Sequence, residues 1–145
     1  MADSAIQKKQ LLSPEATLEV LEVLKEHAIV FGSGKDEIHT FIDPYCELSQ
    51  RYISFMFKKK DRMFKKYKLY FYLLELKGKD SSQMISTILL SDNKEDLLKS
   101  VMVNHDGVEE DGEADASEII DVISDAAKKI GVFKRPYIII NGKVK

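Results

Sequence analysis

The chain has 145 residues, of which 44% are hydrophobic and 32% are charged, so disordered and collagen-like classes are excluded. Its length allows one globular domain whose core needs no disulfide or structural metal. The 22 basic and 24 acidic residues give a formal charge of -2, without the positive excess of a nucleic-acid-binding protein. One cysteine and three scattered histidines exclude an internal disulfide and a spaced zinc site, so we expect no metal and no cofactor.

Membrane and export signals are also weak in this sequence. The longest uninterrupted apolar run, Leu69 to Leu74, is far shorter than the roughly 20 residues of a membrane helix. The opening MADSAIQKKQ has no apolar core of the signal-peptide type. These features predict either a cytoplasmic protein or an exported protein whose signal has been removed.

Capping and turn residues divide the N-terminal half of the chain. Ser13 and Pro14 form a helix start, and leucines at helical spacing extend that helix to about His27. Gly32-Ser33-Gly34 then breaks the chain. Beyond the break, the pattern predicts a strand over 37–42, a turn at 43–44, a helix from 46 to a lysine cluster, and a central strand over 68–76.

Helical patterns dominate the C-terminal half. Apolar periodicity predicts helices over 82–90, 93–103 and 117–130, the last of which stops at Gly131. A β-branched run at 138–140 precedes Asn141-Gly142, a strong hairpin signal. The element order predicts an α/β fold with a mixed central sheet and helices on both faces. We expect residues 1–34 to be a lead-in helix and linker, and residues 35–145 to be the domain.

Two segments of the chain resemble a known family. Residues 41–49, FIDPYCELS, resemble the "F-x-D-P-x-C-x-x-C" active-site segment of thioredoxin-fold thiol-disulfide proteins, most closely the catalytic domain of bacterial periplasmic disulfide isomerases of the Dsb C/G type. Residues 130–142 resemble the segment of that family whose cis proline faces the active cysteine. The resemblance covers roughly residues 28–144. It implies a thioredoxin-like fold, a disulfide-exchange activity and a periplasmic location.

The sequence departs from the family in two positions of the motifs. The second cysteine of the family falls on Ser49, and the usual threonine before the cis proline falls on Arg135. The residues before Ile38 are also too few for the dimerisation domain of the isomerases, so we expect a monomer.

Cys46 is the candidate nucleophile. It lies where a strand ends and a helix begins, so backbone N–H groups and the helix dipole favour the thiolate, which is the attacking species in disulfide exchange. The alternative is an inert buried cysteine, but the Asp43-Pro44 turn predicts a position near the surface. Ser49, one helical turn later, has a hydroxyl that can donate a hydrogen bond to the thiolate but cannot attack a mixed disulfide. It is either a natural residue or a replacement of cysteine.

Other site residues follow from the resemblance. A cis bond before Pro136 would bring the backbone of Arg135 to the sulfur, where it could pair with an extended substrate segment. The Arg135 charge either favours the thiolate or selects acidic peptides, or it is simply solvated. The remaining substrate-binding candidates are the neighbours of Cys46, namely Tyr45, Glu47 and Leu48. His39 and Glu75 are candidates for a buried polar pair below the cysteine.

Charge is unevenly distributed along the chain. Residues 58–68 hold seven basic residues against one acid, and residues 105–118 hold seven acids with no Lys or Arg. Both segments are expected to be solvated surface. The basic cluster is also a candidate for docking an acidic partner or the chain's own acidic loop.

The leading hypothesis is therefore a thiol-disulfide exchange protein with a Cys-x-x-Ser site. Its partners would be cysteine-containing protein substrates and either a thiol or a membrane redox partner, with no nucleic acid. The alternative is a redox-inactive thioredoxin-fold module that binds peptides or acts as a chaperone.

Overall fold

The computed structural model describes residues 10–145 of the chain. Its elements, in chain order, are α2 (Pro14–Leu24), a 3-10 turn (Lys25–His27), β1 (Ile29–Phe31), β2 (Asp36–Ile42), α3 (Glu47–Lys58), α4 (Lys60–Lys66), β3 (Tyr67–Leu73), α5 (Ser82–Leu89), α6 (Lys94–Lys99), a π-helical turn (Ser100–Asn104), α7 (Ser117–Ile130), β4 (Tyr137–Ile140) and β5 (Lys143–Val144).

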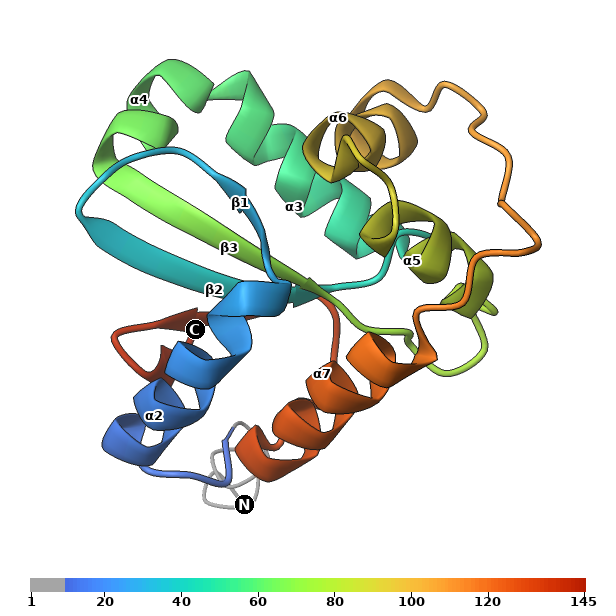
Figure 1. The fold of residues 1–145 in the computed structure, drawn as a ribbon. Helices are drawn as coiled ribbons and strands as arrows, with labels where there is room; N and C mark the ends of the chain where they lie inside the picture. Colours follow the sequence, from blue (N-terminus) through green and yellow to red (C-terminus); the bar gives the residue numbers. More distant parts are fainter. Residues whose placement is uncertain (1–9) are drawn as a thin grey trace.

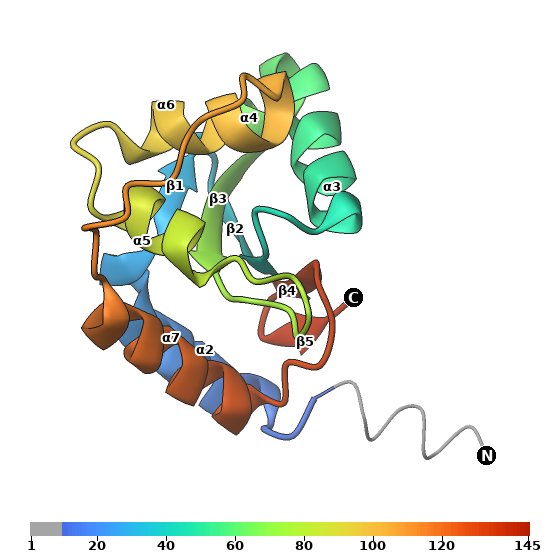
Figure 2. The same cartoon turned by 90° about the vertical axis from the view of Figure 1, so that its right-hand side faces the viewer.

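The strands form one sheet in the order β1-β3-β2-β4-β5. β2 and β3 run parallel, whereas the other neighbouring pairs are antiparallel. Helices α2 and α7 lie side by side against one face of the sheet, and α3 to α6 cover the other (Figures 1 and 2). The expected mixed sheet with helices on both faces is confirmed.

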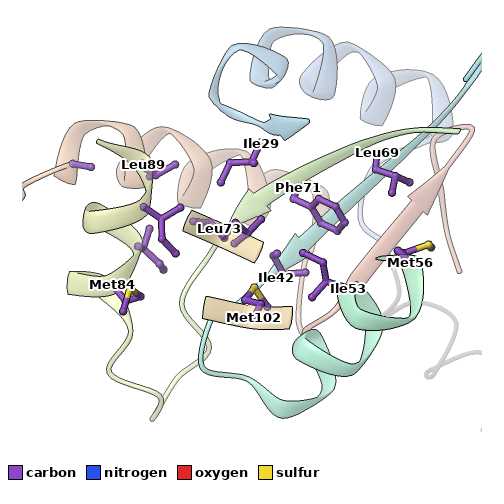
Figure 3. Packing of buried hydrophobic residues seen from close by; sticks show 14 of the residues in the cluster. Ile29, Ile42, Ile53, Met56, Leu69, Phe71, Leu73, Met84, Leu89 and Met102 are labelled. Atoms are coloured by element: carbon purple, nitrogen blue, oxygen red, sulfur yellow. The ribbon is translucent and has the colours of Figure 1, made fainter. Parts of the chain in front are cut away.

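Alternation along β3 divides the core into two layers. Leu69, Phe71 and Leu73 point toward α3, α5 and α6, where they pack with buried residues such as Ile53 (Figure 3). The intervening Tyr70 and Tyr72 point to the opposite face with residues of α2 and α7. This two-residue period explains why β3 is apolar throughout. Each fully buried large apolar side chain contributes roughly 1.5–3 kcal/mol to folding.

The segment before residue 35 is part of the sheet. Residues Ile29–Phe31 pair with β3 as an edge strand, which the sequence pattern did not predict because three residues are too few to show an alternation. The break that follows packs closely against the end of α4: a Cβ at Gly34 would lie 2.0 Å from the carbonyl carbon of Lys66. Only glycine permits this close approach of two backbones.

Several predicted boundaries shift. The lysine cluster divides two helices, because α3 ends at Lys58 and α4 begins at Lys60. β3 ends at Leu73 rather than at residue 76. The Leu74 N–H still donates to Ile42 of β2 at 2.8 Å, but the Leu74 carbonyl accepts from the Arg135 side chain and the Leu76 N–H donates to the Asp43 side chain. Helix α7 ends at Gly131 as expected. In residues 10–145, no helix has the length and apolar character needed to cross a bilayer.

Candidate functional site around Cys46

Cys46 caps the N-terminus of helix α3. Its backbone is extended, with φ -82° and ψ 122°, and its carbonyl accepts the Gln50 N–H at 2.9 Å. The Cys46 N–H in turn donates to the Asp43 carbonyl at 3.0 Å, closing the turn after β2. The side chain therefore sits at the positive end of a 12-residue helix.

Cys46 is buried, with only 4% of its surface exposed, so the expectation of a position near the surface is wrong. The cover comes from the opposite end of the chain. The peptide bond between Arg135 and Pro136 is cis, and the Cys46 thiol donates to the Arg135 carbonyl at 3.9 Å. The two motifs of the sequence thus meet at the sulfur.

Ser49 lies one turn after Cys46 and is fully buried. Its hydroxyl oxygen accepts the backbone N–H of Asp43 at 3.2 Å. Among the hydrogen bonds of the described residues, none joins Ser49 to the sulfur of Cys46. In this structure the hydroxyl therefore holds the turn that precedes Cys46, rather than bonding to the thiol.

Asp43 is the residue that sequence reasoning treated only as a turn former. Its carboxylate is fully buried and accepts three hydrogen bonds: from the Tyr45 N–H at 2.7 Å, the Leu76 N–H at 2.6 Å and the Ser81 hydroxyl at 2.8 Å. Bonds to backbone N–H groups suit a carboxylate that is taken out of water. The bond to residue i+2 is the local pattern that could have identified this role in advance.

The expected polar pair of His39 and Glu75 does not form. The Glu75 carboxylate accepts the N–H groups of Ser81 and Ser82 at the start of α5, at 2.6 and 3.1 Å. The His39 ring bonds instead to Tyr72 and Glu37. The hypothesis of a His39–Glu75 pair is wrong because Glu75 lies beyond the end of β3, where its carboxylate accepts backbone N–H groups at the start of α5.

The side chain of Arg135 is engaged with the protein rather than simply solvated. Its guanidinium donates to the carbonyls of Leu74, Glu75 and Lys134, each at 2.9 Å. Burial lowers the pKa of Arg135, and the nearby charges of Asp43 and Cys46 act in the opposite direction. The residue stays cationic because its ordinary pKa is so high.

The neighbours of Cys46 in the motif have different environments. Tyr45 donates its hydroxyl to Glu110 of the acidic loop at 2.5 Å. The pKa of Tyr45 is raised to about 12, mainly by burial and next by the hydrogen bond to Glu110. Glu47 is exposed and lies 3.5 Å from Arg51, and Leu48 is 59% exposed. Leu48 therefore presents an apolar side chain to solvent two residues after the buried thiol.

The acidic loop packs against α5, not against the basic cluster. Gln83 donates to the carbonyls of Asp111 and Ala114 at 2.6 and 2.8 Å, and Thr87 accepts the Asp111 N–H at 2.9 Å. No ion pair within residues 10–145 joins the loop to residues 58–68. The hypothesis that the two charged segments dock within one chain is therefore wrong, because the loop is held at the Cys46 end by Tyr45 and α5.

Metal ligands are not grouped at this site. Residues 10–145 contain no cluster of three or more His, Cys, Asp or Glu side chains placed to hold a metal ion. The chemistry of the site rests on the thiol of Cys46, the charges of Asp43 and Arg135, and the backbone before Pro136.

Comparisons with known proteins extend the structural result. No protein-family model and no curated protein sequence matches this chain. The catalytic domain of Proteus mirabilis ScsC has a similar structure, with a TM-score of 0.66, 12% identity, and coverage of 92% of this chain and 89% of that one. A putative protein-disulfide isomerase from Pseudomonas syringae is also similar, with a TM-score of 0.65 and 15% identity. The match covers 83% of this chain and 90% of that one. A disulfide interchange protein from Neisseria gonorrhoeae has a TM-score of 0.62 and 15% identity, and the match covers 79% of each chain.

These similarities confirm the thioredoxin-like fold that the sequence motifs implied. The likeness extends over most of both chains. At 12–15% identity it shows the fold alone. Function must be argued from the residues around Cys46.

Proposed function

We propose that this chain carries out thiol-disulfide exchange with Cys46 as the nucleophile. The observation that carries the proposal is the placement of Cys46: its sulfur lies at the N-terminus of α3 and within 3.9 Å of the carbonyl that precedes Pro136. A helix N-terminus and a nearby guanidinium both favour a thiolate. The similar structures include a disulfide interchange protein and a putative protein-disulfide isomerase, which supports the same chemistry.

The reaction has two steps. The Cys46 thiolate attacks one sulfur of a substrate disulfide, a new S–S bond forms, and the other substrate sulfur leaves as a thiolate that takes a proton from water. Ser49 has no sulfur with which to break this mixed disulfide. An external thiol must therefore attack it, releasing Cys46 and forming a disulfide with the substrate sulfur. Each step exchanges one S–S bond for another, with no net oxidation.

Substrates on this proposal are cysteine-containing proteins presented as extended segments. The backbone of Arg135 can pair with such a segment, and the chain neighbours of Cys46, namely Tyr45, Glu47 and Leu48, would contact it on the α3 side. Disulfide exchange on proteins belongs to oxidising compartments, and we propose the periplasm. The redox partner on this proposal is an external thiol or a membrane protein.

A second function is favoured by the burial of Cys46. A thiol that is 4% exposed, with a serine in place of a resolving cysteine, fits a redox-inactive module that binds peptides or acts as a chaperone. Such a protein would use the surface near Pro136 for binding only. The two functions predict opposite effects of folding on thiol reactivity.

The test compares the same cysteine in the folded and the unfolded chain. Because the chain has one cysteine, every adduct with a small disulfide reagent must be at Cys46. Exchange chemistry predicts that the folded chain reacts at neutral pH about tenfold faster than the chain in urea, since folding activates the thiolate. The Cys46→Ala chain, as control, should form no adduct. A folded chain that reacts more slowly than the unfolded one would support the binding module.

A further inference from the structure

One peptide group joins the buried Asp43 carboxylate to the partly buried Arg135 guanidinium. The carbonyl of Glu75 accepts a hydrogen bond from the Arg135 guanidinium at 2.9 Å. The N–H of Leu76, which belongs to the same peptide group, donates to the Asp43 carboxylate at 2.6 Å. The cation thus meets the negative end of the peptide dipole and the anion meets its positive end. Asp43 and Arg135 are connected through this group without a direct ion pair.

Both charged residues also contact Cys46 through their backbones. The Asp43 carbonyl accepts the Cys46 N–H at 3.0 Å, and the Arg135 carbonyl lies 3.9 Å from the Cys46 sulfur. The remaining side-chain bonds tie each charge to its surroundings. Arg135 donates to the carbonyls of Leu74 and Lys134, and Asp43 accepts from Tyr45 and from Ser81 at the edge of α5. The turn before α3 and the segment before β4 are therefore linked by the chain just after β3.

Electrostatics makes this linkage cooperative. Asp43 is fully buried, and the ion pairs of the described residues include none at its carboxylate. A buried carboxylate of this kind depends on hydrogen-bond donors for its stability. Arg135 polarises the peptide group so that Leu76 becomes a stronger donor to Asp43, and Asp43 strengthens the acceptor at Glu75 in return. Removing either charge weakens the contact of the other.

We propose that Asp43 and Arg135 form a peptide-bridged charge pair that positions Cys46. The pair holds the Arg135 carbonyl against the sulfur and sets two opposing charges around it. Arg135 favours the thiolate and Asp43 disfavours it. The proposal rests on the proposed exchange function only for its biological use, because the positioning itself is measurable with a simple alkylating reagent.

Four titratable residues lie within three positions of Cys46 in the chain or carry the carbonyl that its thiol contacts. Asp43 and Tyr45 lie in the turn before α3, Glu47 lies in the first turn of α3, and Arg135 lies before β4. Glu47 is exposed and Tyr45 stays neutral, with its pKa raised to about 12 by burial and by Glu110. The effects of charge at the sulfur are therefore dominated by Asp43 and Arg135.

The experiment is a double-mutant cycle in the full chain with Asp43→Asn, Arg135→Gln and the double variant. The rate of Cys46 alkylation by iodoacetamide is measured across pH, together with urea unfolding. Arg135→Gln should move the rate profile to higher pH and Asp43→Asn to lower pH, each changing the rate near neutrality about fivefold. The double variant should return toward the wild-type profile and lose less stability than the two single losses combined.

Controls separate positioning from general loosening of the fold. Asp80→Asn removes an exposed acid near the same loop and should leave the profile unchanged. Two single variants that move the profile in the same direction, or stability losses that simply add, would overturn the proposal. If Asp43→Asn does not fold, Arg135→Lys decides, because it keeps the charge without the guanidinium fork. The Arg135→Lys variant should keep the wild-type pH profile of Cys46 alkylation. Equal profiles for Arg135→Lys and Arg135→Gln would contradict the proposed charge pair.

The outcome is distinct from that of the proposed function. A chain that forms no mixed disulfide but shows opposite shifts on alkylation would retain the charge pair and lose the exchange activity. A chain that exchanges disulfides but shows no opposite shifts would lose the charge pair alone.

Discussion

Two buried polar clusters lie on β2 and its continuation, and they are built differently. At the Cys46 end, the Asp43 carboxylate bonds to two backbone N–H groups and one hydroxyl. Within the strand, His39 bonds to the Tyr72 hydroxyl at 2.8 Å and to Glu37 at 3.1 Å. Its ring also stacks parallel to the ring of Tyr70, with centroids 4.7 Å apart. The partners of Asp43 lie in loops and at a helix start, whereas the partners of His39 lie on the neighbouring strands β2 and β3.

This difference distinguishes a polar cluster at the candidate site from a polar cluster that only stabilises the fold. In the His39 cluster each ring nitrogen has a side-chain partner, and the ring lies nearly parallel to those of Tyr70 and Tyr72. The Asp43 cluster bonds to the turn before Cys46 and, through the peptide group of Glu75 and Leu76, to Arg135. Burial of a polar group is therefore a poor guide to function by itself. The useful signal is whether its partners belong to loops that meet at a reactive atom.

The largest expected effect comes from giving the Cys46 end a second sulfur. Ser49→Cys places a thiol one helical turn from Cys46, close enough to bridge. The new thiol resolves mixed disulfides at high effective concentration, so insulin reduction should be at least about tenfold faster than in the parent chain. The parent chain should accumulate trapped adducts, which mass spectrometry detects.

A matched control uses the same helix. Ser54→Cys also adds a thiol to α3, but two turns from Cys46, where it cannot bridge. Equal insulin reduction by both variants would mean that position 49 does not resolve the mixed disulfide. Negligible activity in both variants, with no adduct in either, would leave the binding module as the better account.

The second prediction tests the independence of the His39 cluster. Tyr72→Phe removes the hydroxyl that partners His39 in a fully buried position, so the free energy of unfolding should fall by about 1–3 kcal/mol. The reactivity of Cys46 should not change. Urea denaturation and thiol alkylation measure the two effects, with Tyr67→Phe on the same strand as control. A change in thiol reactivity would show that the two clusters are coupled.

A third, smaller effect is the pH dependence of stability. Burial lowers the pKa of His39 below its ordinary value of 6.5. The unfolded chain therefore takes up a proton more readily than the native state as the pH falls through 6.5, and stability decreases toward acid. Burial opposes ionisation of Glu37, but hydrogen bonds from Lys25 and His39 outweigh it and lower its pKa, which adds to the loss at lower pH.

The comparison is made with His39→Phe. Its free energy of unfolding should be lower than that of the parent at about pH 8, but should fall less between about pH 8 and about pH 5.5. Thermal unfolding across this range measures both quantities. An equal pH dependence in parent and variant would assign the effect to other groups.

The smallest effect concerns the contact between Tyr45 and Glu110. Burial and the Glu110 carboxylate together raise the pKa of Tyr45 to about 12. Glu110→Gln removes the carboxylate, so the pKa of Tyr45 should fall. Stability should change by less than about 1 kcal/mol because the acid is exposed. Tyrosine titration by NMR measures the shift, and Glu109→Gln is the control. A Tyr45 pKa that is identical in the two variants would mean that the contact does not form in solution.

Local sequence patterns determined much of the fold. Apolar spacing and end signals predicted α2, α3, α5 and α7, and the order of the elements predicted the mixed sheet. The same patterns placed Cys46 at a helix start and Ser49 one turn later. These features depend on residues within a turn or two of one another, so their physical cause is contained in short stretches of chain.

Tertiary structure decided what surrounds the sulfur. The burial of Cys46 depends on Arg135, which lies 89 positions away, and Arg135 bonds to Leu74 across 61 positions. The partners of Asp43 and Glu75, and the pairing of Ile29–Phe31 with β3, are also contacts between distant segments. No periodicity specifies which backbone group a buried charge will find. That choice follows from packing, because a charge removed from water must be satisfied by whichever donor or acceptor the fold brings to it.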